Sequence, residues 1–75
     1  MTAQFKAFTE FVEDAHSLDK DEVVIPTAEI RKGPWQWITV AFEPIRAKEV
    51  AHWVALVLAW DYGISTPADV RVALR

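Results

Sequence analysis

The segment VAHWVALVLAW, residues 50–60, holds ten apolar residues among its eleven, and the exception is His52. A surface helix is normally apolar along one stripe only, and a helix that spans a membrane needs about twenty apolar residues. The segment is too apolar for the first kind of helix and too short for the second. It therefore predicts a central helix that is covered on more than one side.

We expect this helix to begin near Pro44 and to end at about Tyr62, with Gly63 just beyond it. Helical periodicity gathers large residues on one side, which should pack on a sheet and another helix: Val50, Trp53, Val54, Val57 and Trp60. A second side carries small residues: Ala47, Ala51, Ala55 and Ala59. This alanine side allows close approach of a C-terminal helix or of a second subunit, so Ala55→Leu is expected to overpack that contact.

Residues 3–16 predict a first helix, with Thr2 as its N-cap. One apolar stripe of this helix is expected to lie in the core: Phe5, Phe8, Phe11, Val12 and Ala15. Residues 17–22 are polar and predict a loop.

Two segments with strand character, residues 22–31 and 35–42, flank the turn-forming residues 32–34 and predict a β-hairpin. Pro26 has no N–H to donate to a neighbouring strand. It therefore predicts that the first segment is an edge strand or is broken near its middle.

Strand periodicity places Ile38, Val40 and Phe42 on one face of the second segment, and we expect this face in the core. Trp35 and Trp37 then point outward together. Exposed tryptophans are enriched at the energetic centres of protein interfaces. We therefore expect a partner-binding surface made of Trp35, Trp37, Arg31 and Thr39. The alternative is that both indole rings fill the core.

The register of the hairpin stays open. Pairing Arg31 with Trp35 and Glu29 with Trp37 gives the first strand a polar outer face, and Arg31 could then lie over an indole ring. A two-residue turn at Lys32 and Gly33 would instead pair Ile30 with Trp35.

The end of the chain predicts a short helix with Thr66 as N-cap, Pro67 as its first residue and Asp69 two residues later. Residues 58–74, LAWDYGISTPADVRVAL, resemble the helix-turn-helix of bacterial repressors at Leu58, Ala59, Tyr62, Gly63, Ile64, Ser65, Val70, Arg71, Ala73 and Leu74. One extra residue before Val70 puts Asp69 where that motif has an apolar anchor. The resemblance implies DNA contacts from Ser65, Thr66, Arg71 and Arg75. The alternative is an ordinary joint between two capped helices.

Catalysis and cofactor binding have little support in the sequence. The chain has no cysteine, and its two histidines, His16 and His52, lack the spacing of a metal motif. A triad of His52, Asp61 and Ser65 would need a sharp turn at the serine that the sequence does not offer. Two glycines in all leave no phosphate-binding loop. We therefore expect no enzyme activity, no cofactor and no metal.

The predicted fold is α+β, a single domain over residues 1–75 with a helix, a β-hairpin, a long helix and a short C-terminal helix. The net charge of −3 and the scattered basic residues argue against nucleic acid as the main partner. The N-terminus lacks the apolar region of a signal peptide, and no segment is long enough to cross a membrane, so we expect a cytoplasmic protein.

The predicted function is a small, non-enzymatic protein-interaction module: a regulator, inhibitor or assembly factor of a kind common among phage and mobile-element accessory proteins. The alternatives are a DNA-binding regulator that uses residues 58–75 and a self-assembling structural subunit. Because 75 residues without a disulfide or metal make a marginal domain, we also expect a homodimer.

Overall fold

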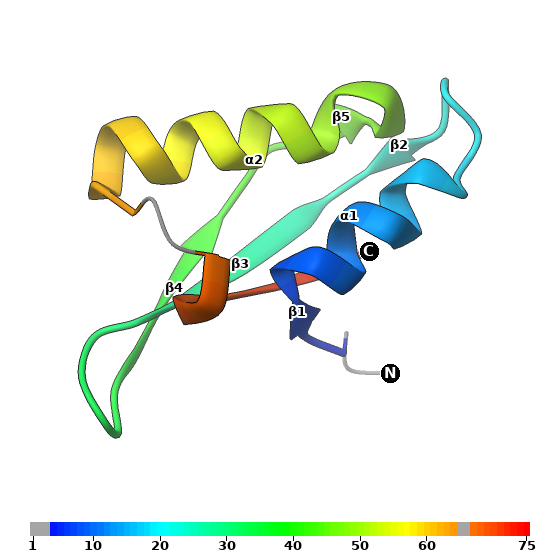
Figure 1. Cartoon of the computed structure of the whole chain (residues 1–75). Coiled ribbons are helices and arrows are strands. Elements are labelled where there is room, and N and C mark those ends of the chain that lie inside the picture. The colour runs from blue at the N-terminus through cyan, green and yellow to red at the C-terminus, as the bar shows by residue number, and fades with distance from the viewer. Residues whose placement is uncertain (1–3, 65–66) are drawn as a thin grey trace.

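Two helices cover one face of a four-stranded antiparallel sheet in the computed structural model, which describes residues 4–64 and 67–75 (Figure 1). The α+β class is therefore confirmed. The elements are β1 (Lys6–Ala7), α1 (Phe8–His16), β2 (Val23–Val24), β3 (Pro26–Arg31), β4 (Trp37–Ala41), β5 (Ile45–Arg46), α2 (Ala47–Tyr62), a 3-10 turn η1 (Pro67–Asp69) and β6 (Val70–Leu74).

The C-terminal segment is a strand, and the predicted C-terminal helix is wrong. β6 lies inside the sheet, whose order is β1-β6-β3-β4. Val70 and Val72 are buried against the helices, while Arg71 between them points to the open face. This alternation has the two-residue period of a strand. β6 pairs with β1 on one side and with β3 on the other, and these strands provide hydrogen-bond partners for its backbone. The local capping signals predicted a helix and gave no indication of this pairing.

The segment around Pro26 is broken, as one of the two sequence-based alternatives predicted. β2 ends at Val24, and Ile25 exchanges backbone hydrogen bonds with Arg75. Pro26 is the first residue of β3, a position where a strand tolerates proline. The edge-strand alternative is wrong, because β3 lies between β6 and β4.

The predicted hairpin is present as β3 and β4, but neither register that the sequence suggested is found. Arg31 lies opposite Trp37, and Ile30 lies opposite Ile38. A five-residue loop, residues 32–36, replaces the short turns, closed by the Lys32 N–H, which donates to the Gln36 carbonyl over 2.8 Å. Gly33 adopts a positive φ of 116°, next to a proline of fixed φ, and the chain reverses over this longer path.

The predicted faces of the second hairpin strand are confirmed for the residues in β4. Val40 is buried toward the helices, Ile38 and the following Phe42 are half-buried, and Trp37 points to the open face. Trp35 is not in the strand at all. It lies in the loop and is 93% exposed.

Helix α1 begins at Phe8, because residues 6–7 pair with β6 instead of continuing the helix. The proposed cap Thr2 lies outside the described residues. Phe11 and Ala15 are buried, and Phe8 and Val12 pack against the same core, which confirms those four members of the predicted stripe. Phe5 precedes β1 and is half-buried.

Helix α2 begins at Ala47, three residues after Pro44, and ends as predicted at Tyr62, where Gly63 follows with a left-handed φ of 67°. Its buried residues are Ala47, Val50, Val54 and Leu58. The prediction that Trp53 and Trp60 belong to the packed side is wrong, since they are 49% and 81% exposed. The sheet and α1 cover only two sides of α2, and the tryptophans lie on neither.

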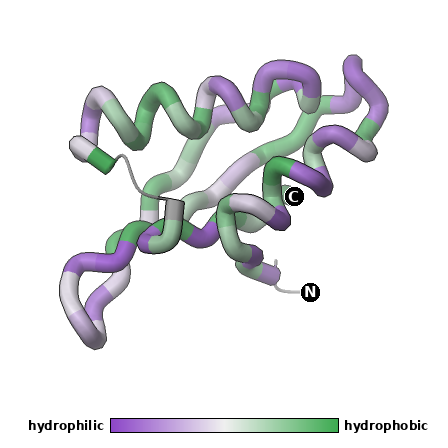
Figure 2. The backbone as a smooth tube through the Cα atoms, viewed as in Figure 1, coloured by the Kyte–Doolittle hydropathy of each residue, from purple (hydrophilic) through white to green (hydrophobic). Residues whose placement is uncertain are grey.

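Ala55 and Ala59 on the same helix are exposed. The expectation that Ala55→Leu would overpack a contact within the fold is therefore wrong. Hydrophobic residues predominate along the middle of α2, whereas the loops before β2 and between β3 and β4 are mostly hydrophilic (Figure 2).

Candidate functional site

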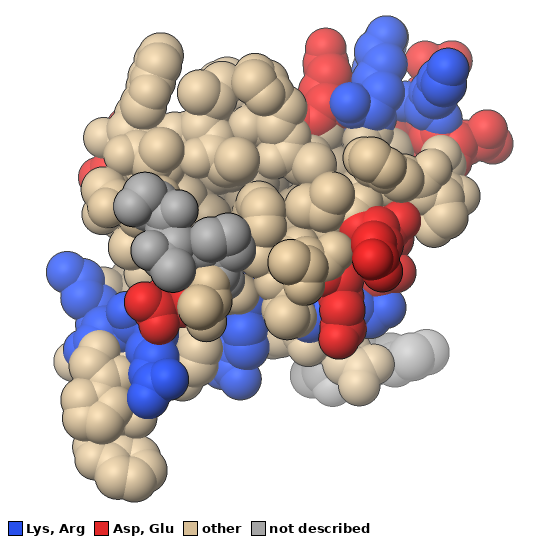
Figure 3. Space-filling view, viewed as in Figure 1, with Lys and Arg blue, Asp and Glu red and all other residues tan. Residues whose placement is uncertain are grey.

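The residues predicted to bind a partner gather at one end of the sheet. Arg31 lies directly across from Trp37, and Thr39 follows two positions along the same face. Trp35 extends from the loop that joins their strands, where the Arg31 Nε donates to the Gly33 carbonyl over 3.2 Å. We call Arg31, Trp35, Trp37 and Thr39 the hairpin surface. In Figure 3 an uncharged tip projects from the molecule at this end, with Lys and Arg side chains beside it.

Trp37 is held in place by Arg71, not by Arg31 as the sequence suggested. The Arg71 guanidinium carbon lies 3.8 Å from the centre of the Trp37 ring. Its Nη2 donates to Glu29 Oε1 over 2.7 Å, and its buried Nε has no hydrogen-bond partner among the described residues. A cation over an indole contributes about 0.5–2 kcal/mol. Sequence reasoning missed this role because it placed Arg71 on a helix.

A second exposed apolar region lies on α2. Trp53 and Trp60 are the exposed members, and Leu56 and Val57 between them are half-buried. We call these four residues the α2 outer surface. Their spacing of three, four and seven residues brings them to one side of the helix. The helical periodicity of these residues is visible in the sequence, but it suggested that the tryptophans lie in the core, so this surface was not predicted.

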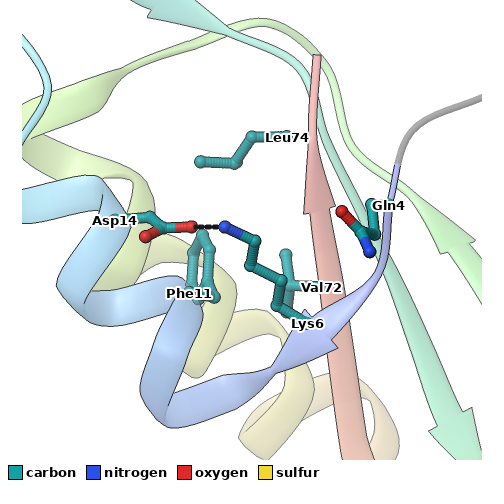
Figure 4. Close-up of a pocket in the computed structure, with 6 residues that line it drawn as sticks. All are labelled: Gln4, Lys6, Phe11, Asp14, Val72 and Leu74. Carbon is teal, nitrogen blue, oxygen red and sulfur yellow. Dashed lines mark hydrogen bonds and ion pairs between the residues drawn. The ribbon is translucent and has the colours of Figure 1, made fainter. Parts of the chain in front are cut away.

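A small pocket of about 200 Å³ lies between α1, β1 and β6 (Figure 4). Inside it the Lys6 ammonium donates to Asp14 Oδ2 over 2.5 Å, and both side chains are still more than 40% exposed. Phe11, Val72 and Leu74 supply apolar walls. An exposed ion pair without a nucleophile or a second carboxylate in the pocket lining is typical of a surface contact that fastens α1 to β1.

Asp14→Asn is expected to lower the pKa of Lys6. The hydrogen bond and the charge of Asp14 raise this pKa above its ordinary value of 10.5, and together they outweigh desolvation. Because the folded-state pKa is the higher one, the stabilisation is present below that ordinary value and is lost as the pH rises through the folded pKa. NMR titration of the Lys6 ammonium measures the shift. The exposed neighbour variant Glu13→Gln should leave the pKa unchanged, and an equal shift in both variants contradicts the pairing.

The groups weighed for catalysis do not converge. His52 and Asp61 are nine residues apart on α2, a rise of about 13 Å, and Ser65 lies outside the described residues. Among residues 4–64 and 67–75, no cluster of three His, Cys, Asp or Glu side chains could hold a metal ion. In the same ranges, no helix combines the length and the apolar character needed to cross a membrane.

The residues assigned to DNA binding do not form a recognition helix. Ser65 and Thr66 lie outside the described residues. Arg71 lies in β6 and contacts Trp37 and Glu29, and the backbone of Arg75 pairs with Ile25. A helix-turn-helix needs a second helix to enter the major groove. A strand at residues 70–74 removes that helix, so the helix-turn-helix interpretation is wrong.

The chain was compared with protein-family models, with curated proteins and with solved structures. No protein-family model matches the chain, and no curated protein and no solved structure shows significant similarity to it.

Proposed function

We propose that this protein is a small, non-enzymatic interaction module of the cytoplasm: a regulator, inhibitor or assembly factor that binds another protein through the hairpin surface. The observation that carries the proposal is Trp35, whose side chain is 93% exposed on a projecting loop. Full exposure of a large indole costs hydration free energy in the isolated molecule, and covering it in an apolar pocket of a partner recovers about 1.5–3 kcal/mol.

The neighbours of Trp35 support this role. Trp37 is fixed by Arg71, so a partner that covers it loses little side-chain entropy. Arg31 and Lys32 are exposed beside the two indoles and make this end of an otherwise acidic chain locally basic. We therefore expect the partner to offer an apolar pocket that is bordered by acidic side chains, because complementary charge favours encounter and register.

Trp35→Ala is expected to abolish partner binding without destabilising the fold. An indole at the centre of an interface supplies about 2 kcal/mol or more, which is roughly a thirtyfold change in Kd. Surface substitutions usually alter the free energy of unfolding by about 0.5 kcal/mol or less. The measurement is affinity capture from extracts of the source cells, followed by titration of the captured protein in purified form against both chains.

Val23→Ala is the control, because Val23 is also an exposed apolar residue but lies in β2, outside the hairpin surface. The proposal requires a protein that the wild type and Val23→Ala bind equally and that Trp35→Ala loses. Equal binding of that protein by all three chains would show that the hairpin surface is not its binding site.

A further inference from the structure

Among the described residues, strand β4 is an edge of the sheet without the charged residues or proline that usually protect one. In the part of the chain that the structure describes, it pairs with β3 and with no other strand. Edge strands are normally protected by charged residues, proline, bulges or very short length. β4 has the sequence WITVA, which is five residues long and contains neither a charge nor a proline. The opposite edge, β1, is only two residues long.

The backbone groups that β4 leaves unpaired follow from its hydrogen bonds to β3. The Lys32 N–H donates to the Gln36 carbonyl, and the Phe42 N–H donates to the Pro26 carbonyl. Residues alternate in direction along an antiparallel pair. Ile38 and Val40 therefore point their backbone groups toward β3, and Trp37, Thr39 and Ala41 point theirs away from it.

The α2 outer surface lies on the same side of the molecule as this edge. Ala47 and Ala51 of α2 line a pocket together with Ala15 of α1, so that flank of α2 faces α1. Trp53 is two residues beyond Ala51, which is about 200° around the helix. α1 contacts β6 and β1, and α2 lies on the β4 side of α1 in Figure 1. The tryptophans therefore lie on the flank of α2 that faces away from α1, which is the flank nearer to the open edge.

We propose that a second copy of this chain occupies both features, with β4 pairing antiparallel to β4 across a two-fold axis and the two α2 outer surfaces in contact. A register centred on Thr39 is the one that uses all three outward residues. It places Thr39 opposite Thr39 of the second copy and Trp37 opposite Ala41, a large side chain beside a small one. The two sheets become one, and no edge at β4 remains.

Charge complementarity favours a second copy over an unrelated peptide. Antiparallel pairing brings the hairpin end of each β4, where Arg31 and Lys32 are exposed, next to the other end of its partner, where Glu43 is exposed. No like charges meet within the paired strands, because β4 carries none.

The two exposed indole rings of α2 supply part of the area that a stable dimer needs. Buried aromatic side chains contribute about 150–250 Å² each, so the exposed parts of Trp53 and Trp60 supply roughly 200–300 Å². A specific interface needs about 800 Å² on each partner, and the β4 edge with the rest of the α2 outer surface lies beside these two rings to provide the remainder. The inference does not rest on the proposed function, which assigns partner binding to side chains of the hairpin surface.

Sedimentation equilibrium of the full chain at tens of micromolar tests the proposal, and the expected result is twice the 8.5 kDa mass of one chain. Thr39→Pro removes an N–H that points away from β3, so it should spare the hairpin and yield a folded monomer. Thr39→Ala keeps that N–H and should remain a dimer. Trp60→Glu should raise the dimer dissociation constant by roughly thirtyfold or more. Tyr62→Glu is the control: it places the same charge on another side of α2 and should leave the dimer dissociation constant unchanged.

Amide exchange of the wild type gives a result that depends on no variant. The N–H groups of Trp37, Thr39 and Ala41 should exchange slowly at concentrations where the dimer forms and quickly on dilution. A monomeric wild type overturns the proposal. A dimer in which these three amides exchange quickly also overturns it. So does a Thr39→Pro or Trp60→Glu variant that circular dichroism shows to be folded and that still dimerises as tightly as the wild type.

Discussion

Val70→Asp is expected to leave the protein largely unfolded, although it changes a residue only five positions before Arg75. Val70 is 2% exposed and lies opposite Ile30 at the start of β6. The substitution removes about 1.5–3 kcal/mol of apolar burial and adds a carboxyl group that must be buried without a partner or protonated, at a cost of several kcal/mol. A chain of 75 residues has a total stability of only about 4–11 kcal/mol.

Val23→Asp is the matched control, because it makes the same chemical change at a valine that is 61% exposed in β2. Its free energy of unfolding should change by about 0.5 kcal/mol or less. Circular dichroism and urea unfolding of both variants provide the comparison. A Val70→Asp variant that unfolds cooperatively at the wild-type urea midpoint would mean that residue 70 is not in the core.

The C-terminal strand could not be predicted from its own residues. The segment VRVAL fits a two-residue period, and it also offers apolar residues at helical spacing after an apparent N-terminal cap. The choice between a helix and a strand depends on residues that are distant in sequence. β3 offers an edge to which β6 can pair, and β1 pairs with the other edge of β6. Because β propensity depends strongly on the strands that surround a segment, local signals gave the wrong element.

The faces of β4 were predictable and those of α2 were not. A strand has two faces, and the residues Ile38, Val40 and Phe42 identified the buried one without knowledge of the fold. Around α2 nearly every position is apolar, so the sequence indicates a buried helix but not the direction of its neighbours. The neighbours are the sheet and α1, and the exposed tryptophans became evident only once both were in place.

The candidate site shows the same division. The outward direction of Trp37 followed from the strand pattern, whereas Trp35 is exposed because it lies in the loop and not in the strand where the sequence placed it. The partner of Trp37 did not follow from the strand pattern, because Arg71 reaches it from β6, a strand whose position depends on the whole sheet.

Phe11→Ala is expected to destabilise the protein by about 3–5 kcal/mol, the second large effect that the structure predicts. Phe11 is 2% exposed and packs in a core cluster to which α1, α2, β3 and β6 all contribute. Truncation leaves a cavity that the sheet and α2 cannot close without moving apart. Urea unfolding measures the loss, which should approach the full stability of so short a chain.

The other two phenylalanines of the predicted stripe provide a graded control. Phe8 packs against the core from its margin, with its ring 5.6 Å from that of Phe11, and Phe5 is half-buried outside the core cluster. Sequence periodicity makes the three equivalent, whereas the structure orders the expected losses as Phe11 first, Phe8 second and Phe5 last. Equal losses for Phe5→Ala and Phe11→Ala would mean that the helix continues through residue 5, as the sequence alone suggested. A graded series agrees with a helix that begins at Phe8, because residues 6–7 pair with β6 and Phe5, which precedes them, lies outside the core cluster.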